Sequence, residues 1–76
     1  MHYVHKLVYL PSSKRWHAYE GTNYCCPIHC GDFISIRVKD RYFLARVELD
    51  TQWYLLIEDL KFRLHPKEKY DTILMF

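Results

Sequence analysis

The residue types that could do chemistry gather in one short segment, Cys25–Cys30, with the sequence Cys-Cys-Pro-Ile-His-Cys. Thiolates and imidazoles are the ligands that zinc prefers, and Cys26 together with Cys30 could reach one ion. The segment lacks the Cys-x-x-Cys spacing of zinc knuckles and ribbons, and no second ligand pair follows it. His17 or His65 would therefore have to complete a tetrahedral site.

The other interpretation of these residues is structural. Cys25 and Cys30 then act as small buried hydrophobes, and His29 lies at the surface. A Cys–His nucleophile would need a positioned thiolate, a third orienting group and a cleft that excludes water, and a domain of this size offers little cleft. Gly31-Asp32 fits a turn, because glycine tolerates unusual φ angles and aspartate bonds backbone amides. We therefore expect no metal ion, no cofactor and no enzyme, with a small zinc-binding module as an alternative.

Length and composition indicate one globular domain. The chain has 76 residues, of which 50% are hydrophobic and 17% aromatic. A domain this short buries only about 60% of the surface of its unfolded chain, so it needs a rich core. The formal net charge is +2 and the sequence pI is about 8.5, below the value of about 9 that is usual for nucleic-acid-binding domains. Nucleic acid is therefore the second choice of partner.

The sequence indicates neither secretion nor membrane insertion. Met1–Leu10 lacks an apolar run and contains two His and one Lys, unlike a signal peptide. No stretch approaches the roughly 20 apolar residues of a transmembrane helix. The three Cys are an odd number in one short segment, which does not suit a disulfide framework. We expect a reduced, cytoplasmic protein without a membrane partner.

Apolar and polar residues alternate almost without interruption between Phe33 and Leu64. Because successive side chains of a strand point to opposite faces, this pattern predicts strands with one apolar and one polar face. Three such runs separated by short polar breaks predict an antiparallel meander. The expected fold class is all-β, a bent meander that closes into a small SH3-like barrel with little or no helix. Its predicted core residues are Ile34, Ile36, Val38, Phe43, Val47, Trp53, Leu55 and Ile57.

The remaining segments extend this meander at both ends. The single domain 1–76 divides into an N-terminal hairpin at 1–20, an irregular crossover at 21–32, the meander at 33–64 and a C-terminal strand at 70–76. Within the hairpin, Pro11–Lys14 supplies the turn. Trp16 and Ala18 are expected on one face of its second strand, with His17 on the other.

Loop lengths set the expected registers of the meander, because the side-chain period of two ties each cross-strand pair to its loop. Two-residue loops are expected at Lys39-Asp40 and Asp59-Leu60, and a three-residue loop at Asp50–Gln52. The hairpin with the Asp59-Leu60 loop also places Glu58 opposite Lys61 on the outer face, a favourable charge pair. The inner-face pairs that follow are Ile36 with Phe43, Ile34 with Ala45, Val47 with Leu55, Leu49 with Trp53 and Ile57 with Phe62.

The polar face of the meander carries the residues that we expect to bind a partner. Arginine and tyrosine are enriched at binding hot spots, and exposed Leu44 and Leu56 would add an apolar patch. Aromatic side chains between arginines on a sheet can also stack nucleic-acid bases. The alternative is a second core layer, formed by the first hairpin or the last strand. The predicted partner-binding residues are Arg37, Tyr42, Leu44, Arg46, Tyr54, Leu56 and Arg63.

The last strand, Tyr70–Phe76, is apolar on both faces at its end. Ile73 and Met75 fall on one face, and Leu74 and Phe76 on the other. Such a strand is either central to the fold or covered by another molecule. If its edge is unpaired, Ile73 and Met75 would mediate a homodimer. In the alternative, a loop or the first hairpin covers them.

Several short motifs between Leu7 and Leu64 resemble those of a known family. They are Arg15, Tyr19, His29-Cys30-Gly31-Asp32, Arg46-Val47-Glu48, Trp53-Tyr54-Leu55 and Leu60–Leu64. The family consists of short proteins from plasmids, conjugative elements and prophages of Gram-positive bacteria, catalogued as a domain of unknown function. The resemblance implies a compact β fold and a mobile-element origin, without an established activity.

That setting suggests a non-enzymatic protein that inhibits a host defence nuclease by protein–protein contact, in the manner of anti-CRISPR proteins. The expected partner is then a protein such as a CRISPR effector nuclease. The alternative function is a nucleic-acid-binding β-barrel in element maintenance or regulation. The two differ in salt response, because a phosphate binder loses affinity log-linearly with salt.

Overall fold

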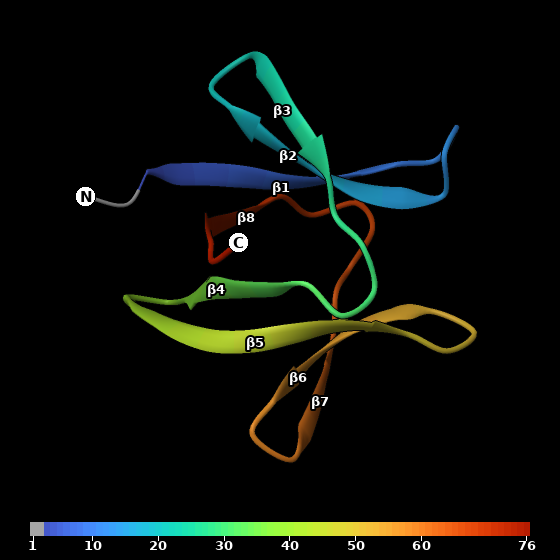
Figure 1. Cartoon of the computed structure of the whole chain (residues 1–76), viewed down its shortest axis with the longest axis vertical. Helices are drawn as coiled ribbons and strands as arrows, with labels where there is room; N and C mark the ends of the chain where they lie inside the picture. The colour runs from blue at the N-terminus through green and yellow to red at the C-terminus, as the bar shows by residue number, and fades with distance from the viewer. Residues whose placement is uncertain (1–2) are drawn as a thin grey trace.

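Over residues 3–76, which the computed structural model describes, the chain forms eight β-strands and no helix (Figure 1). This confirms the all-β fold class. Residues 1–2 of the predicted N-terminal hairpin lie outside the described residues. None of the described residues belongs to a helix long and apolar enough to cross a membrane. The strands are β1 (Val4–Leu10), β2 (Arg15–Glu20), β3 (Asn23–Pro27), β4 (Phe33–Val38), β5 (Arg41–Leu49), β6 (Trp53–Ile57), β7 (Leu60–Arg63) and β8 (Tyr70–Leu74).

All strands belong to one antiparallel sheet, in the order β3-β2-β1-β8-β4-β5-β6-β7. The last strand of the chain therefore sits in the middle of the sheet. In Figure 1, β1–β3 lie on one side of β8 and β4–β7 on the other. The sheet stays open, with β3 and β7 at its ends, so closure into an SH3-like barrel is not confirmed. The expected crossover at 21–32 contains the strand β3.

The central place of β8 corrects the prediction of an unpaired C-terminal edge. Ile73 lies opposite both Val4 of β1 and Ser35 of β4. The buried hydroxyl of Thr72 donates a hydrogen bond of 2.8 Å to the carbonyl of Ser35. Ile73 and Leu74, which point to opposite faces, are both half-buried, so both faces at the end of β8 are partly covered within the chain, which fits its sequence. A homodimer through Ile73 and Met75 therefore has no free edge to use, although the side chain of Met75 is exposed.

The predicted registers of the first two meander hairpins are confirmed. Ile36 faces Phe43 across β4 and β5, and Val47 faces Leu55 across β5 and β6. Lys39, the first residue of the β4–β5 loop, has a φ of +60°. Positive φ at this position suits two-residue hairpin loops, because it matches the twist of the flanking strands.

The predicted register of the third hairpin is wrong by two residues. The loop is Glu58-Asp59, so Ile57 faces Leu60 instead of Phe62, and Lys61 faces Leu56 instead of Glu58. Every side chain keeps its predicted face, because a slip of two leaves the alternation unchanged. The φ of +57° at Glu58 marks the loop that forms.

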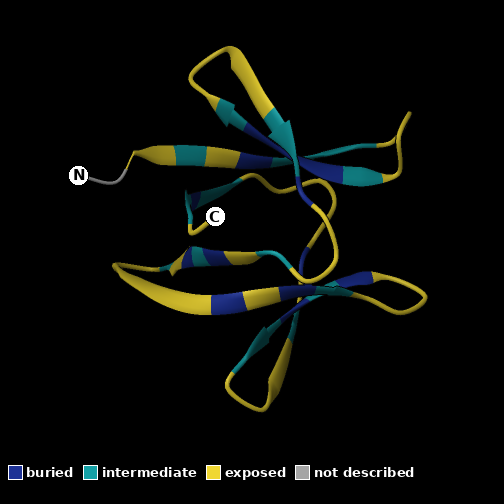
Figure 2. Cartoon of the chain, in the orientation of Figure 1, coloured by how far each residue is buried: buried dark blue, intermediate teal, exposed yellow. Residues whose placement is uncertain are grey.

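The core lies between the two halves of the coiled sheet, where the buried positions of Figure 2 meet. Trp16 and Ala18 lie on the same, core-facing side of β2, as predicted. Ile57 and Val38 are partly buried and pack at the margin of the core. Phe43 was expected in the core and is instead 38% exposed. The buried hydrophobic residues are Leu7, Trp16, Ala18, Ile28, Ile34, Ile36, Ala45, Val47, Trp53, Leu55 and Leu64.

Trp53 joins the two halves of the sheet. Its indole Nε1 donates a hydrogen bond of 3.0 Å to the carbonyl of Lys14, in the β1–β2 turn. The guanidinium of Arg15 lies 5.2 Å from the centroid of the Trp53 ring and donates through Nη1 to the carbonyl of Ile28 at 2.9 Å. These contacts hold the first hairpin against β6 and thereby fix the sheet that carries the candidate surface.

Candidate protein-binding surface

The predicted partner-binding residues all lie on the outer face of β4–β7, the face turned away from the core. Arg37 lies opposite Tyr42, Arg46 lies opposite Leu56, and Tyr54 lies opposite Arg63. No second core layer covers this face: of the residues predicted to bind a partner, only Tyr54 and Leu56 are half-buried and the others are exposed. Leu44 is the most open, with 59% of its surface accessible.

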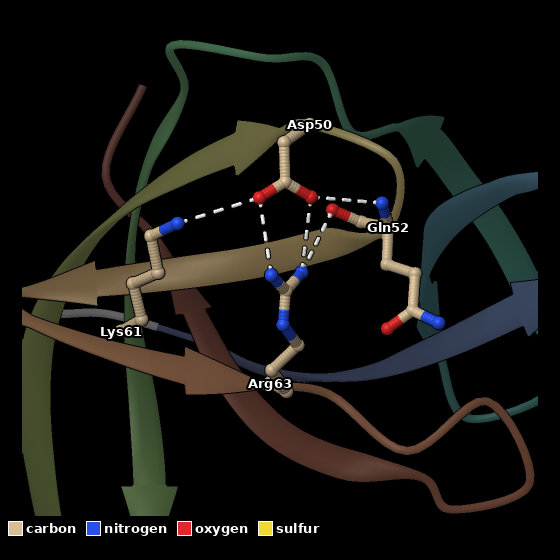
Figure 3. A network of polar contacts seen from close by, with 4 residues as sticks. All are labelled: Asp50, Gln52, Lys61 and Arg63. Carbon is tan, nitrogen blue, oxygen red and sulfur yellow. Dashed lines mark hydrogen bonds and ion pairs between the residues drawn. The ribbon is translucent and has the colours of Figure 1, made fainter.

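Asp50, in the β5–β6 loop, organises one end of this face (Figure 3). Its carboxylate accepts hydrogen bonds from Arg63 Nη1 at 3.1 Å, Arg63 Nη2 at 3.0 Å and Lys61 Nζ at 3.4 Å. The backbone N–H of Gln52 donates to the same carboxylate at 2.9 Å. The Arg63 guanidinium, followed by the Gln52 amide, holds the pKa of Asp50 well below its usual range. The loop and the edge strand β7 are thereby tied together.

Tyr54 is the aromatic residue that this network positions. Lys61 Nζ lies 4.7 Å and Arg63 Cζ lies 5.3 Å from the centroid of its ring. Cations at this distance are attracted to the face of an aromatic ring. Sequence reasoning identified Tyr54 and Arg63 but missed Asp50 and Lys61, because the register of the last hairpin was wrong. In the observed register, Lys61 and Arg63 lie on the same face of the sheet as Tyr54, and both reach the carboxylate of Asp50.

The other predicted arginines also have carboxylate partners within the chain. Arg46 forms an ion pair with Glu48 two residues along β5, and Glu48 accepts a hydrogen bond of 3.3 Å from the thiol of Cys30. Arg37 donates to Asp71 of β8 at 3.1 Å. Asp71 also pairs with Lys6, and these two cations, Lys6 first, lower its pKa. Each arginine of the outer face thus has a carboxylate partner, but Asp50 and Asp71 each serve two cations, so these ion pairs leave a small positive excess.

The outer face also contains an apolar depression. A pocket of about 460 Å³ lies where β5 and β6 diverge, and its lining includes Leu44, Leu56 and Arg46. Phe33, which is 47% exposed, lies at its rim. Phe33 was missed because it precedes the first inward residue of the alternation and was not counted as part of the outer face. The face therefore combines a fixed aromatic ring, paired arginines and an apolar depression.

The residues that follow the cysteine-rich segment form a tight turn at Gly31. The N–H of Asp32 bonds to the carbonyl of His29 at 3.1 Å, and the Asp32 carboxylate accepts the N–H of His29 at 2.8 Å. Gly31, with a φ of +94°, occupies the turn position that favours glycine. Gly31 and Asp32 both bond to the backbone of Val47, which makes a β-bulge at the start of β4.

The cysteines themselves are spread out. Cys25 and Cys30 are exposed, which corrects the expectation that they are buried, whereas His29 is exposed as predicted. Cys26 is half-buried opposite Ala18, and its burial raises the pKa of its thiol to about 11. Among residues 3–76, no group of three or more His, Cys, Asp or Glu side chains is arranged to hold a metal ion.

A separate polar cluster, which sequence reasoning missed, joins the first turn to β3. His17 is buried and bonds through Nε2 to the hydroxyl of Ser13 at 2.8 Å and through Nδ1 to the hydroxyl of Tyr24 at 3.0 Å. Burial, followed by the charge of Arg15, lowers the pKa of His17. The cluster attaches the edge strand β3 to β2 by side chains as well as by the ladder.

Comparison with protein families identifies residues 5–72, almost the whole chain, as a domain of unknown function, DUF5348. The chain belongs to this family. No curated protein and no solved structure matches it. In this DUF5348 domain, the motifs that carry the resemblance are largely structural: Arg15 and Trp53 hold the two halves of the sheet together, and Gly31 forms the bulge. The residues of those motifs that belong to the outer face are Arg46, Glu48, Tyr54, Lys61 and Arg63.

Proposed function

We propose that this protein is a non-enzymatic binding protein that engages a protein partner through the outer face of β4–β7. The observation that carries the proposal is the pairing of Arg37, Arg46 and Arg63 with carboxylates of the same chain. A surface that binds nucleic acid needs cations available for phosphates. Here each of these arginines is already engaged by a carboxylate, although Asp50 and Asp71 are each shared by two cations. Beside them the face exposes apolar area at Leu44.

The arrangement also suits a binding hot spot. Tyrosine and arginine dominate hot spots when they are surrounded by contacts that exclude water. The ring of Tyr54 is in contact with both Lys61 and Arg63, so little conformational entropy is lost when a partner covers it. Leu44 and Leu56 provide apolar area beside it.

The resemblance to mobile-element proteins leads us to propose a host defence nuclease in the cytoplasm, such as a CRISPR effector, as the partner. An inhibitor of this kind acts by occupying a surface of the nuclease and needs no catalytic residues. A compact, rigid domain with a preorganised face meets that requirement.

Capture of the partner from host lysate, with and without nuclease treatment, tests this proposal. We expect one host protein to be retained in both samples, with an affinity that changes little between low and moderate salt. The double variant Arg46→Ala plus Tyr54→Ala should lose the partner, and Lys67→Ala plus Tyr3→Ala, which removes an exposed cation and an exposed tyrosine elsewhere, should retain it. Loss of capture after nuclease treatment, with a steep log-linear salt dependence, would instead support the nucleic-acid-binding alternative.

A further inference from the structure

The strand β5 has an unpaired edge in the interior of the sheet. Its residues 41–46 pair with β4, but only its residues 46–49 pair with β6. Beyond Arg46 the β6–β7 hairpin turns away from β5, as Figure 1 shows. Within the part of the chain that the structure describes, the segment 41–45 therefore has a strand neighbour on one edge and none on the other.

The hydrogen-bonding groups that face this open edge can be assigned from the ladder. The N–H of Val47 donates to the carbonyl of Asp32 at 2.8 Å, on the β4 side. In an antiparallel pair, alternate residues bond to the same neighbour. Ala45 and Phe43 therefore also bond to β4, and the N–H and C=O groups of Tyr42 and Leu44 point to the open edge.

The two terminal edges of the sheet carry features that discourage pairing, and the β5 edge does not. β3 ends at Pro27 and contains a bulge at Cys25, which has no partner between the pairs of Tyr24 and Cys26. β7 is only four residues long and carries Lys61 and Arg63. Proline, bulges, short length and charge are the usual protections of an edge strand. The open part of β5 carries the exposed apolar residues Tyr42, Phe43 and Leu44.

Both faces of this edge are hollow and apolar. The pocket of about 460 Å³ opens to the outer face between Leu44 and Leu56 and reaches through the gap to Phe43 and Ile57. On the inner face a second pocket of about 260 Å³ lies beside Phe43 and is lined also by Phe62 and Leu60. Leu60 is 72% exposed, the largest exposed fraction of any large hydrophobic residue between residues 3 and 76.

We propose that a second copy of this chain adds its own β5 edge to this one, antiparallel, across a two-fold axis at Phe43. Tyr42 of one copy then exchanges backbone hydrogen bonds with the partner's Leu44, and the reverse pair does the same. Phe43 lies against the partner's Phe43 at a non-hydrogen-bonded position, where side chains approach most closely. Both aromatic rings fill the inner pockets beside Leu60.

Charge favours a second copy over a foreign strand. Among the described residues, neither Arg41 nor Glu58 takes part in an ion pair. Arg41 begins the open segment of β5, and Glu58, in the β6–β7 loop, lines the outer pocket together with Ala45 near the other end of that segment. The two-fold axis brings the partner's Arg41 opposite Ala45 and therefore beside Glu58, and it does so twice. The edge is thus complementary to itself.

Sedimentation equilibrium and amide hydrogen exchange on the intact chain test the dimer. We expect twice the monomer mass at high concentration, with protection of the Tyr42 and Leu44 amides that is lost on dilution. The amides of Phe43 and Ala45 should stay protected throughout, because they bond to β4. Phe43→Lys should give a monomer with an unchanged far-UV circular dichroism spectrum. A wild-type chain that stays monomeric at millimolar concentration, or a Phe43→Lys variant that still dimerises, would overturn the proposal.

A charge exchange separates this interface from any other mode of dimerisation. Arg41→Glu alone and Glu58→Arg alone each place like charges together and should weaken the dimer by about tenfold or more. Mixing the two single variants should restore association, because both opposite-charge contacts re-form in the mixed dimer. Equal affinity of the mixture and the separate variants would contradict the two-fold arrangement. Tyr42 and Leu44 belong to both proposed surfaces, but the capture test changes Arg46 and Tyr54 whereas the charge exchange changes Arg41 and Glu58. Failure of one proposal is therefore distinguishable from failure of the other.

Discussion

Arg63 at the end of β7 and Asp50 in the β5–β6 loop form a two-pronged ion pair, 13 residues apart in the sequence. Each terminal nitrogen of the guanidinium donates to a different carboxylate oxygen (Figure 3). This fork geometry is specific to arginine, and it fixes orientation as well as charge. The pair therefore sets the position of Arg63 beside the ring of Tyr54, at the β7 end of the proposed binding face.

Asp50→Asn is expected to lower both the melting temperature and the affinity for the partner. The folded state depresses the pKa of Asp50, so its stabilising effect is present at neutral pH and is lost as pH falls through the folded pKa, in strong acid. The variant should therefore lose part of the acid dependence of stability below about pH 4. Asp59→Asn, which changes a loop carboxylate without an ion pair among residues 3–76, is the control. Identical melting curves for the two variants would show that the pair does not stabilise the fold.

His17 predicts a second pH dependence, in mild acid. Its pKa is lowered in the folded state, so the unfolded chain takes up a proton near pH 6.5 while the folded chain resists it. Stability should therefore decline as pH falls below about 6.5, until the folded pKa is reached. Urea unfolding at pH 7.5 and 5.5 measures this decline. His17→Gln should reduce it, whereas His65→Gln, at an exposed loop position, should keep it.

The alternation of apolar and polar residues was sufficient to predict the inner half of β4–β6. Ile34, Ile36 and Val47 are buried as expected, because a register error of one residue would expose them all. The same rule cannot detect a slip of two, which is why the β6–β7 register was missed. The register of that hairpin depends on the positive φ of Glu58, and no glycine at this position signals it in the sequence.

The rest of the fold depends on long-range pairing that local pattern does not report. Nothing local in Tyr70–Phe76 says that β8 inserts between β1 and β4, and Thr72 gives a polar residue at a fully buried position. The bulge at Cys25 interrupts the alternation of β3. The outer face was predicted correctly as a set, but its ion pairs, such as Arg37 with Asp71, depend on the unpredicted central strand.

Gly31→Ala is expected to destabilise the fold by about 1–2 kcal/mol through backbone strain alone. The φ of +94° is unfavourable for a residue with a Cβ, and an added Cβ would meet no atom within 4 Å. Gly31→Asn should cost less, because asparagine tolerates positive φ better than alanine. Denaturant unfolding of both variants measures the difference. An alanine variant as stable as the wild type would show that the bulge at Val47 is not required.

We predict that the purified protein contains no stoichiometric zinc and that a chelator leaves its melting temperature unchanged. Cys25, Cys26 and Cys30 do not converge on one point with a histidine among the described residues. Structural zinc contributes directly to folding, so its removal would lower the melting temperature sharply. Native mass spectrometry is the direct measurement. One zinc ion per chain, lost in Cys26→Ser or Cys30→Ser, would make the zinc-binding module the preferred interpretation of this segment.

Val47→Asp is expected to unfold the protein. Val47 is 2% exposed, and its backbone anchors the bulge at Gly31. An unpaired carboxylate at such a position costs several kcal/mol, against a total stability of about 5–15 kcal/mol for a domain. The same exchange at Val4, an exposed position of β1 that is also within a strand, should cost no more than about 1 kcal/mol. Circular dichroism and one-dimensional NMR of both variants make the comparison. If Val47→Asp retains a dispersed spectrum, the inner face of β5 is not the core that the alternation and the burial indicate, and the outward assignment of Arg46 and Leu44 would be wrong with it.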